Sequence, residues 1–186
     1  MQQEKRGEAD VRELERVVLP HLDAAYNLAR WLVRDPQNAE DVVQEACLRA
    51  VKFFSGYRGG DSRAWLLRIV RNSAYSFLEK SRSADLAEEF DETLHVSPGD
   101  PQENVEATLI KSADSQMLQK ALERLPVRFR EALVLRELEG LSYKEISEVM
   151  EIPIGSVMSA LARGREQLRE EILRGREREV RRGLRR

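Results

Sequence analysis

The sequence predicts an all-α protein with two small helical domains, joined by an acidic, flexible linker, and a helix-turn-helix in the second domain. Apolar residues recur with the 3.6-residue period of helices in both halves, and no segment shows the alternation typical of strands. Only 6% of the 186 residues are aromatic although 41% are hydrophobic, so aliphatic side chains and alanine must form the cores. Between the halves, residues 83–110 contain eight acids and no Lys or Arg.

The first domain is expected over residues 9–82 and opens with a long helical pattern. This pattern runs over residues 9–19, bends or restarts at Pro20, and continues to Arg34. A bend is expected at Pro20 because proline removes a backbone donor and clashes with the preceding turn. The sequence "DPQN" then interrupts the helix, because proline and asparagine favour turns.

Two further helices are expected in this domain. Over residues 39–54 the apolar positions 39, 42, 43, 46, 50, 53 and 54 fit one face of a helix, so Phe53 is expected on the core side. The following "SGYRGGDS" is expected to be a loop, because its glycines and polar residues disfavour regular structure. Ser62 is a plausible N-cap for the next helix, which should end near Lys80, since a serine side chain can accept a hydrogen bond from a free backbone N–H.

Residues 83–112 are expected to form the linker, because prolines, glycine and uncompensated acids cannot build a packed core. The second domain is expected over residues 113–175. It opens with an apolar helical stripe that stops at Pro126. A further helix should run from about Val127 to Leu138 and end at the glycine that follows.

The end of the second domain has the pattern of a helix-turn-helix. Ser142 and Glu145 form the S-x-x-E capping box of a short helix that ends near Met150. The turn "EIPI" follows, and a last helix should start near Ile154 and run past residue 172. Residues 176–186 are expected to be a basic C-terminal tail.

The helix over residues 39–54 has an outer face that its own core does not explain. This face contains Asp41, Gln44, Glu45 and Leu48. Polar residues there are ordinary on a solvated surface. A leucine framed by acids and glutamine has a second interpretation, a small protein-docking surface.

The next helix has the complementary character, because Arg68, Arg71, Asn72 and Tyr75 lie opposite its core stripe. Guanidinium groups can neutralise phosphates, and an aromatic ring among them can stack on an unpaired base. The alternative is a solvated basic face with Tyr75 half buried. Trp65 borders this face and is expected to belong to the core.

The loop before that helix contains Tyr57 and Arg58 between glycines. We expect Tyr57 to be a flexible, exposed aromatic side chain that could accept a flipped base.

The last helix has a small polar outer face. Ser156, Ser159 and Arg163 are expected to point outward, with Met158 and Ala160 on the flanks. Backbone N–H groups and Ser156 at the helix start, with Arg163 one to two turns later, could contact DNA phosphates. The alternative is that the two helices only pack against each other.

Enzymatic functions find no support in the sequence, and no catalytic, cofactor-binding or metal-binding residues are predicted. His21 and His95 have no partner at ligand spacing, and no glycine-rich phosphate loop follows a strand. The single cysteine, Cys47, is expected to be a structural thiol. No segment approaches the length of apolar sequence that a membrane span needs, and we expect a cytoplasmic protein.

Three motifs in order resemble those of extracytoplasmic-function (group IV) sigma factors of bacterial RNA polymerase. The first domain carries "AEDVVQEACLRA" and "WLLRIVRNSAYSFLEKSR". The second carries "LPVRFREALVLRELEGLSYKEISEVMEIPIGSVMSALARGREQLR". The resemblance covers residues 12–82 and 114–172. It implies a transcription initiation factor that binds core polymerase and promoter DNA and is controlled by an anti-sigma factor.

The resemblance also implies roles for the residues singled out above. The polymerase-docking set is Asp41, Gln44, Glu45 and Leu48. The residues that would open and recognise the −10 element are Tyr57, Arg58, Arg68, Arg71, Asn72 and Tyr75. The set for the −35 element is Ser156, Ser159, Arg163 and Arg165. The acidic linker would enter a positively lined channel of the polymerase, where its charges mimic RNA phosphates; a plain flexible tether is the alternative.

One departure from the family concerns Met158 and Ala160, where related proteins commonly carry Lys or Arg. Recognition of the −35 element would then depend on Ser156, Ser159, Arg163, Arg165 and the backbone, or on DNA shape. From the helical wheel we expect Ala160→Arg to strengthen DNA binding by adding a cation at the edge of this face.

Two other functions remain open at this point. A helix-turn-helix repressor or activator would bind duplex DNA unaided and usually as a dimer. An all-helical scaffold protein would tolerate the acidic linker but would not explain the basic face of Arg68, Arg71 and Tyr75.

Overall fold

The structure, a computed structural model, describes residues 12–88 and 109–183, and the parts of the chain within these ranges contain helices and no strands. A helical segment over residues 12–18 precedes the first named element. The first half continues with the 3-10 turn η1 (Leu19–His21), α2 (Leu22–Val33), α3 (Pro36–Phe53), η2 (Phe54–Gly56) and α4 (Ser62–Glu88). The second half comprises α5 (Leu109–Arg124), α6 (Val127–Leu133), the π-helical turn η3 (Val134–Leu138), α7 (Tyr143–Met150) and α8 (Ile154–Gly183).

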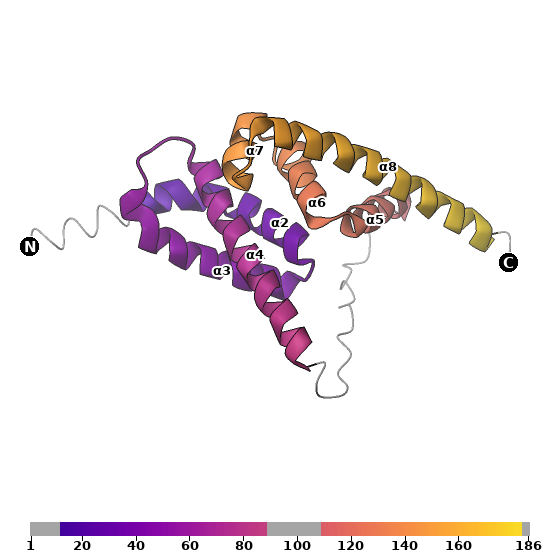
Figure 1. Cartoon of the computed structure of the whole chain (residues 1–186), viewed down its shortest axis with the longest axis horizontal. Coiled ribbons are helices and arrows are strands. Elements are labelled where there is room, and N and C mark those ends of the chain that lie inside the picture. The colour runs from indigo at the N-terminus through magenta and orange to yellow at the C-terminus, as the bar shows by residue number, and fades with distance from the viewer. Residues whose placement is uncertain (1–11, 89–108, 184–186) are drawn as a thin grey trace, which may run out of the picture.

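Helices α2, α3 and α4 pack against one another as a three-helix bundle (Figure 1). Alanines line much of the contact: Ala25, Ala29, Ala39, Ala46 and Ala50 are all fully buried. Small side chains let helix axes approach closely, and the larger Leu28, Leu32, Leu66, Leu67 and Val70 fill the space between them. This packing holds the outer faces of α3 and α4 in fixed directions.

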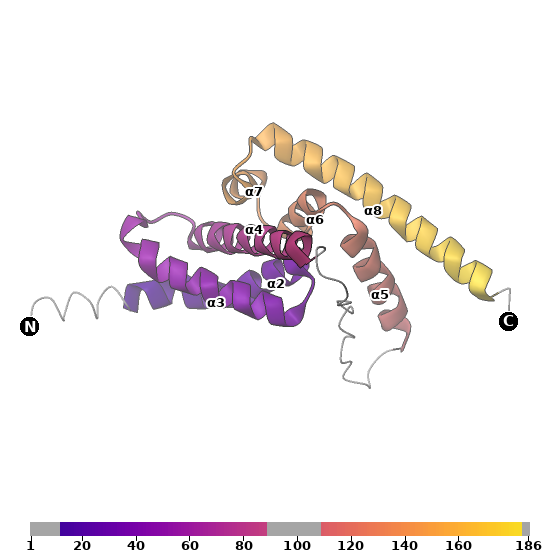
Figure 2. The same cartoon turned by 60° about the horizontal axis from the view of Figure 1, so that its bottom comes forward.

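The second half is organised by α8, which lies across α5, α6 and α7 (Figures 1 and 2). Its buried stripe includes Val157 and Leu161, which pack with Leu133, Leu135 and Ile146 of the other helices. The capping box at the start of α7 is present: Ser142 Oγ accepts from the Glu145 N–H at 3.2 Å, and Glu145 Oε2 accepts from the Ser142 N–H at 2.6 Å. The predicted helix-turn-helix is therefore confirmed.

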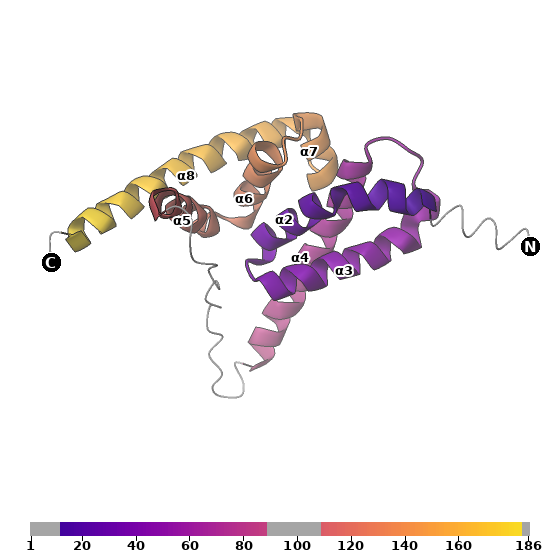
Figure 3. The same ribbon diagram turned by 180° about the vertical axis from the view of Figure 1, so that it is seen from behind.

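The two halves contact each other through α4 with α7 and through α2 with α6 (Figure 3). The C-terminal part of α8 projects away from the first bundle (Figures 1 and 3). The all-α class and the division into two helical domains agree with the sequence prediction.

Several predicted boundaries differ from the structure. The N-cap of α4 is Asp61, whose carboxylate accepts from the Ala64 N–H at 2.8 Å, and this bond lowers the pKa of Asp61. The hydroxyl of Ser62, predicted as the cap, lies 2.9 Å from His21 Nε2 instead. Helix α4 continues to Glu88 rather than ending near Lys80, and α8 includes most of the predicted tail up to Gly183. Most of the acidic linker lies outside the described residues.

Helix α8 approaches α6 closely at Gly164. A Cβ atom added there would lie 3.2 Å from Leu133 Cγ and 3.3 Å from the Phe129 carbonyl oxygen. A larger side chain cannot be placed without moving backbone, because one of these neighbours is a main-chain atom. Gly164 therefore fixes the distance between α8 and α6.

We predict that Gly164→Leu lowers the free energy of unfolding by about 1–3 kcal/mol, the usual cost of overpacking a core. The matched control is Gly155→Leu, where an added Cβ meets nothing within 4 Å. Both substitutions remove a helical glycine, so the difference between them isolates the packing cost. Urea denaturation followed by circular dichroism measures it, and equal stabilities of the two variants would contradict the assignment.

Candidate functional site

The outer face of α3 presents the predicted docking residues to solvent. Asp41, Gln44 and Glu45 are exposed, and Leu48 is 67% exposed. Arg49 Nε donates to Glu45 Oε1 at 2.7 Å, one helical turn apart. An exposed leucine among polar side chains is available to a partner without any change in the fold.

This apolar surface is larger than the sequence indicated. Val51, one turn after Leu48, is exposed and adds a second aliphatic side chain to the same side of α3. Phe53 was predicted to lie on the core side and is 56% exposed, so that prediction is wrong. The helix ends at Phe53, and the chain turns into η2, where Phe54 is half buried and its ring lies against those of Tyr57 and Trp65.

The loop after η2 is built around an aromatic cluster. The ring centroid of Tyr57 lies 4.9 Å from that of Trp65 and 5.9 Å from that of Phe54. Its hydroxyl donates to the Gly60 carbonyl at 3.1 Å. Gly59 and Gly60 have positive φ values of 82° and 100°, a conformation that returns the loop to α4. The expected flexible, exposed Tyr57 is wrong: its ring is half buried and fixed in place.

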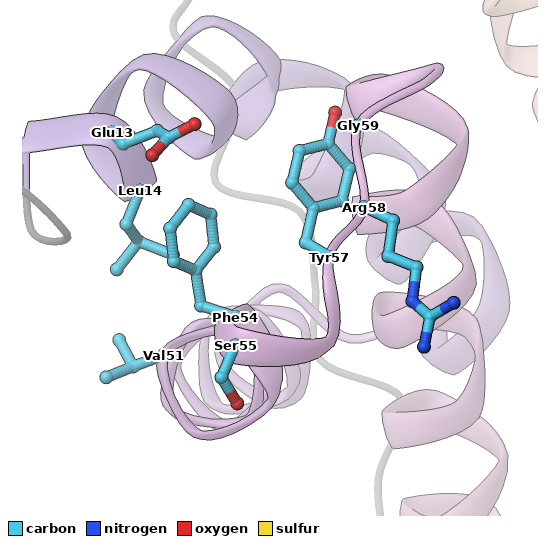
Figure 4. Close-up of a pocket in the computed structure, with 8 residues that line it drawn as sticks. All are labelled: Glu13, Leu14, Val51, Phe54, Ser55, Tyr57, Arg58 and Gly59. Atoms are coloured by element: carbon cyan, nitrogen blue, oxygen red, sulfur yellow. The ribbon is translucent and has the colours of Figure 1, made fainter.

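An open pocket lies beside this cluster, between the N-terminal helical segment and the loop (Figure 4). Phe54 and Tyr57 face it from one side and Leu14 and Glu13 from the other, whereas Arg58 points away. A second hollow, on the α4 side of the loop, is lined by Arg58, Tyr57, Trp65 and Arg68, with Glu148 of α7 at its edge. Aromatic surface and cations therefore meet on the α4 side of Tyr57, the arrangement that binds unpaired bases and phosphates, whereas the first pocket is lined by aromatic and aliphatic side chains and Glu13.

On the basic face of α4, Arg71, Asn72 and Tyr75 already take part in hydrogen bonds. Arg71 Nε donates to Glu131 Oε1 of α6 at 2.6 Å, and the Tyr75 hydroxyl donates to Glu131 Oε2 at 2.8 Å. Arg71 also donates to Asn72 Oδ1 at 3.2 Å, and its guanidinium lies over the Tyr75 ring at 4.6 Å. Arg68 is exposed. The open face expected from the sequence is thus divided between a solvent-exposed part and a part in contact with the second domain.

Burial shifts the ionisation of this group. Glu131 is 0% exposed, and its burial raises its pKa, against the opposite effect of the Arg71 charge. Burial also raises the pKa of Tyr75, helped by the neighbouring Glu131 carboxylate. Next to Glu131 in the chain, burial lowers the pKa of Arg130 to about 10.

A second carboxylate of the same domain repeats the contact. Glu139, which follows η3, accepts hydrogen bonds from Arg63 of α4 and, at 3.4 Å, from Asn27 Nδ2 of α2. The side chain of Glu139 is buried, so this ion pair is held at the contact between the domains.

The start of α8 carries the predicted outward row. Ser159 and Arg163 are exposed, and Ser156 is half buried. The Ser159 hydroxyl donates to the Gly155 carbonyl at 2.9 Å. Arg165 is exposed and donates to Glu137 Oε1 at 2.7 Å, a surface ion pair of the kind that DNA phosphate can displace.

The two flanking residues of this row differ in position. Met158 is 54% exposed, whereas Ala160 is 2% exposed and belongs to the core. The expectation that Ala160→Arg would strengthen DNA binding is therefore wrong, because a long cation there would enter the interior.

The other chemistry-bearing residues show no second site. Within residues 12–88 and 109–183, no cluster of His, Cys, Asp or Glu is placed to hold a metal ion, and none of the helices is long and apolar enough to cross a membrane. Burial lowers the pKa of His21 and raises that of the half-buried Cys47 thiol. His95 lies outside the described residues.

Comparison with known proteins matches each helical bundle to one family. Residues 17–84 match Sigma-70 region 2, and residues 115–168 match Sigma-70 region 4. The two helical domains thus define the class of bacterial sigma-70-type transcription factors.

Related proteins narrow this class. The chain is 32% identical to the RNA polymerase sigma-H factor of Pseudomonas aeruginosa, covering 89% of each protein. It is 32% identical to the ECF RNA polymerase sigma-E factor of Haemophilus influenzae, covering 78% of this chain and 79% of that one. It is 36% identical to the ECF sigma factor SigE of Mycolicibacterium smegmatis over 83% of this chain, which spans 59% of that relative's length. The chain belongs to the extracytoplasmic-function (ECF) RNA polymerase sigma factors.

Solved structures agree with this fold. The sigma factor RpoE of Bartonella quintana, crystallised with the anti-sigma factor NepR, has a TM-score of 0.69 and 26% identity, covering 87% of this chain and 97% of that one. CnrH, in complex with the cytosolic domain of CnrY, has a TM-score of 0.59 and 23% identity over 86% of each chain.

Proposed function

We propose that this ECF sigma factor binds core RNA polymerase through the α3 face and directs initiation at promoters with −10 and −35 elements. Residues 9–82 would act as the polymerase-docking and −10 domain, and residues 113–175 as the −35 domain, with residues 83–112 between them. The observation that carries the proposal is that a region 2 and a region 4 occur in order in one chain, each on its own bundle. The protein acts by binding, in the cytoplasm, and not by catalysis.

The residue assignments follow the resemblance of the sequence motifs to those of the family, and exposure supports the docking set and Arg163. We assign Asp41, Gln44, Glu45 and Leu48 to polymerase binding, extended by Val51. The −10 element is assigned to Tyr57, Arg58, Arg68, Arg71, Asn72 and Tyr75. The −35 element is assigned to Ser156, Ser159, Arg163 and Arg165. The linker acids would occupy a basic channel of the polymerase.

An anti-sigma factor is the proposed regulator. The support is that the similar RpoE was crystallised with NepR, which is an anti-sigma factor. The partner would have to cover surfaces that polymerase or DNA needs, and the exposed leucine of α3 is one such surface.

Transcription from a promoter library with core polymerase tests the function. A sigma factor gives promoter-specific transcripts only when both core and this chain are present. A repressor would instead bind duplex DNA unaided as a dimer, with half-sites about one helical turn apart. A scaffold protein would do neither, and the absence of core-dependent transcripts would refute the proposal.

Leu48→Asp should weaken binding to core polymerase by about 2 kcal/mol, the effect expected of an interface anchor. Helix content should not change, because Leu48 lies outside the core. Leu173→Asp, at another exposed leucine, is the matched control. A titration of labelled core polymerase measures both variants, and unchanged binding by Leu48→Asp would exclude this face as the docking site.

Tyr57→Ala should reduce opening of the −10 region, because stacking on one base contributes about 1–3 kcal/mol. Tyr57→Phe keeps the ring against Trp65 and loses only the bond to the Gly60 carbonyl, so it should retain most opening. Permanganate reactivity of thymines in the open complex measures this. Normal opening by Tyr57→Ala would mean that another residue accepts the base.

Arg163→Ala should weaken promoter binding almost equally for all −35 sequences and lower the salt slope by about one, as for a phosphate contact. Arg174→Ala is the control on the same helix, since Arg174 pairs with Glu171 at 2.7 Å beyond the outward row. Met158→Lys, at an exposed position, should strengthen binding with little new selectivity. Transcription from a −35 library at two salt concentrations measures all three, and a loss limited to certain bases would make Arg163 a base-recognising residue.

A further inference from the structure

Two buried carboxylates of the second domain pair with arginines of the first, and a third carboxylate lies near two more. Glu131 of α6, Glu139 after η3 and Glu148 of α7 are here called the acidic row. Glu131 bonds Arg71 at 2.6 Å and Glu139 pairs with Arg63, whereas Glu148 lines the same hollow as Arg58 and Arg68. Helix α7, which carries Glu148, packs against α4 (Figures 1 and 3).

The contacts of Glu131 are those that a nucleic-acid phosphate would make. Its two oxygens each accept one bond, from the Arg71 guanidinium at 2.6 Å and from the Tyr75 hydroxyl at 2.8 Å. Arginine binds carboxylate and phosphate with the same donor geometry. While Glu131 accepts these two bonds, the Arg71 Nε–H and the Tyr75 hydroxyl are not available to DNA.

We propose that the acidic row takes the place of DNA phosphates within the free protein and holds it in a closed state in which part of the −10 face is covered. This inference rests on the proposed function, because it takes Arg71, Asn72 and Tyr75 as −10 contacts. Helices α6 and α7 must leave α4 before single-stranded DNA can bind there.

The closed state covers only one of the proposed binding surfaces. The docking residues Asp41, Glu45 and Leu48 of α3 remain exposed, and so do Ser159 and Arg163 of α8. Polymerase can therefore dock on α3 while the domains are still closed. When the domains then separate on the polymerase, the −10 face becomes free. Single-stranded DNA therefore binds after α3 has docked on the polymerase.

Charge reversal across the contact tests closure without DNA. Arg63→Glu should oppose Glu139 and open the chain, seen as a larger radius of gyration in small-angle X-ray scattering of the full chain. The double variant Arg63→Glu with Glu139→Arg restores opposite charges and should return the wild-type value. Arg165→Glu, which breaks the ion pair of Arg165 with Glu137 inside the second domain, is the control and should leave the radius unchanged.

DNA binding by the free chain tests masking. The probe is a short, fluorescently labelled single-stranded DNA of randomised sequence, titrated without polymerase. Glu131→Gln keeps the size of the side chain but removes its charge, so the affinity should rise about tenfold if the open state is a minor species in the wild type. Glu171→Gln removes a carboxylate of the second domain that pairs with Arg174, a residue outside the proposed DNA-binding sets, and it should not change the affinity.

The outcomes separate this inference from the proposed function. Circular dichroism shows whether each variant is folded. If Arg63→Glu does not fold, Glu131→Gln still tests the closed state. The closed state is overturned if Arg63→Glu leaves the radius of gyration unchanged and Glu131→Gln leaves the DNA affinity unchanged. If the wild-type chain still supports promoter-specific transcription, the proposed function stands. A larger radius of gyration for Arg63→Glu and tighter DNA binding by Glu131→Gln support the closed state. If core-dependent transcription fails at the same time, the proposed function is refuted and the closed state is not.

Discussion

A buried cation and a buried anion stand side by side on α6, and the relation of the two domains depends on how their charges are satisfied. Arg130 is buried and donates to the Leu32 carbonyl at 3.4 Å, at the C-terminal turn of α2, where carbonyl oxygens lack helical partners. Glu131 is satisfied only by Arg71 and Tyr75 among the contacts of the described residues. Arg130 also donates to the Glu123 carbonyl at 3.0 Å and to the Leu125 carbonyl at 3.4 Å within its own domain, so Glu131 depends on the first domain more than Arg130 does. Removing one partner from such a buried group leaves a charge without compensation, which costs far more than a surface ion pair contributes.

This constraint explains why the charged face of α4 has two different environments. Its exposed end, with Arg68 beside the aromatic cluster of Tyr57 and Trp65, can meet a ligand directly. Its covered end can meet a ligand only by exchanging Glu131 for it. Because the exchange replaces one anion with another, the polar groups of α4 are satisfied in both states, and the free-energy difference between them can be small. A small difference is what allows a partner to shift the balance.

The fold was largely predictable because its helices are specified locally. The apolar period, Pro20, "DPQN" and the Ser142–Glu145 capping box act within a few residues, and the structure contains the elements that they indicate. Predictions were wrong where a second element decides the environment. A helical wheel assumes one buried stripe and places Ala160 on its flank. Helix α8 packs on α5, α6 and α7 at once, so its buried face is wider and includes Ala160.

The candidate site shows the same division. The exposure of Leu48 follows from its own helix, so the sequence indicated it correctly. Tyr57 depends on Phe54 and Trp65, which the loop brings together, and its burial was missed. The engagement of Arg71 and Tyr75 by Glu131 joins residues 60 and 56 positions apart, beyond the reach of any local pattern.

Local specification of each bundle together with polar contacts between them suits a protein that must change partners. If the domains met through a large apolar surface, separating them would expose that surface to water at a cost proportional to its area. Here the contact includes Glu131, Glu139 and Arg130, and water, DNA or protein can satisfy such groups after separation. Buried apolar residues of both halves also form one continuous cluster, so separation exposes apolar surface as well. Opening therefore depends on a partner that satisfies the polar groups and offsets the loss of apolar contact.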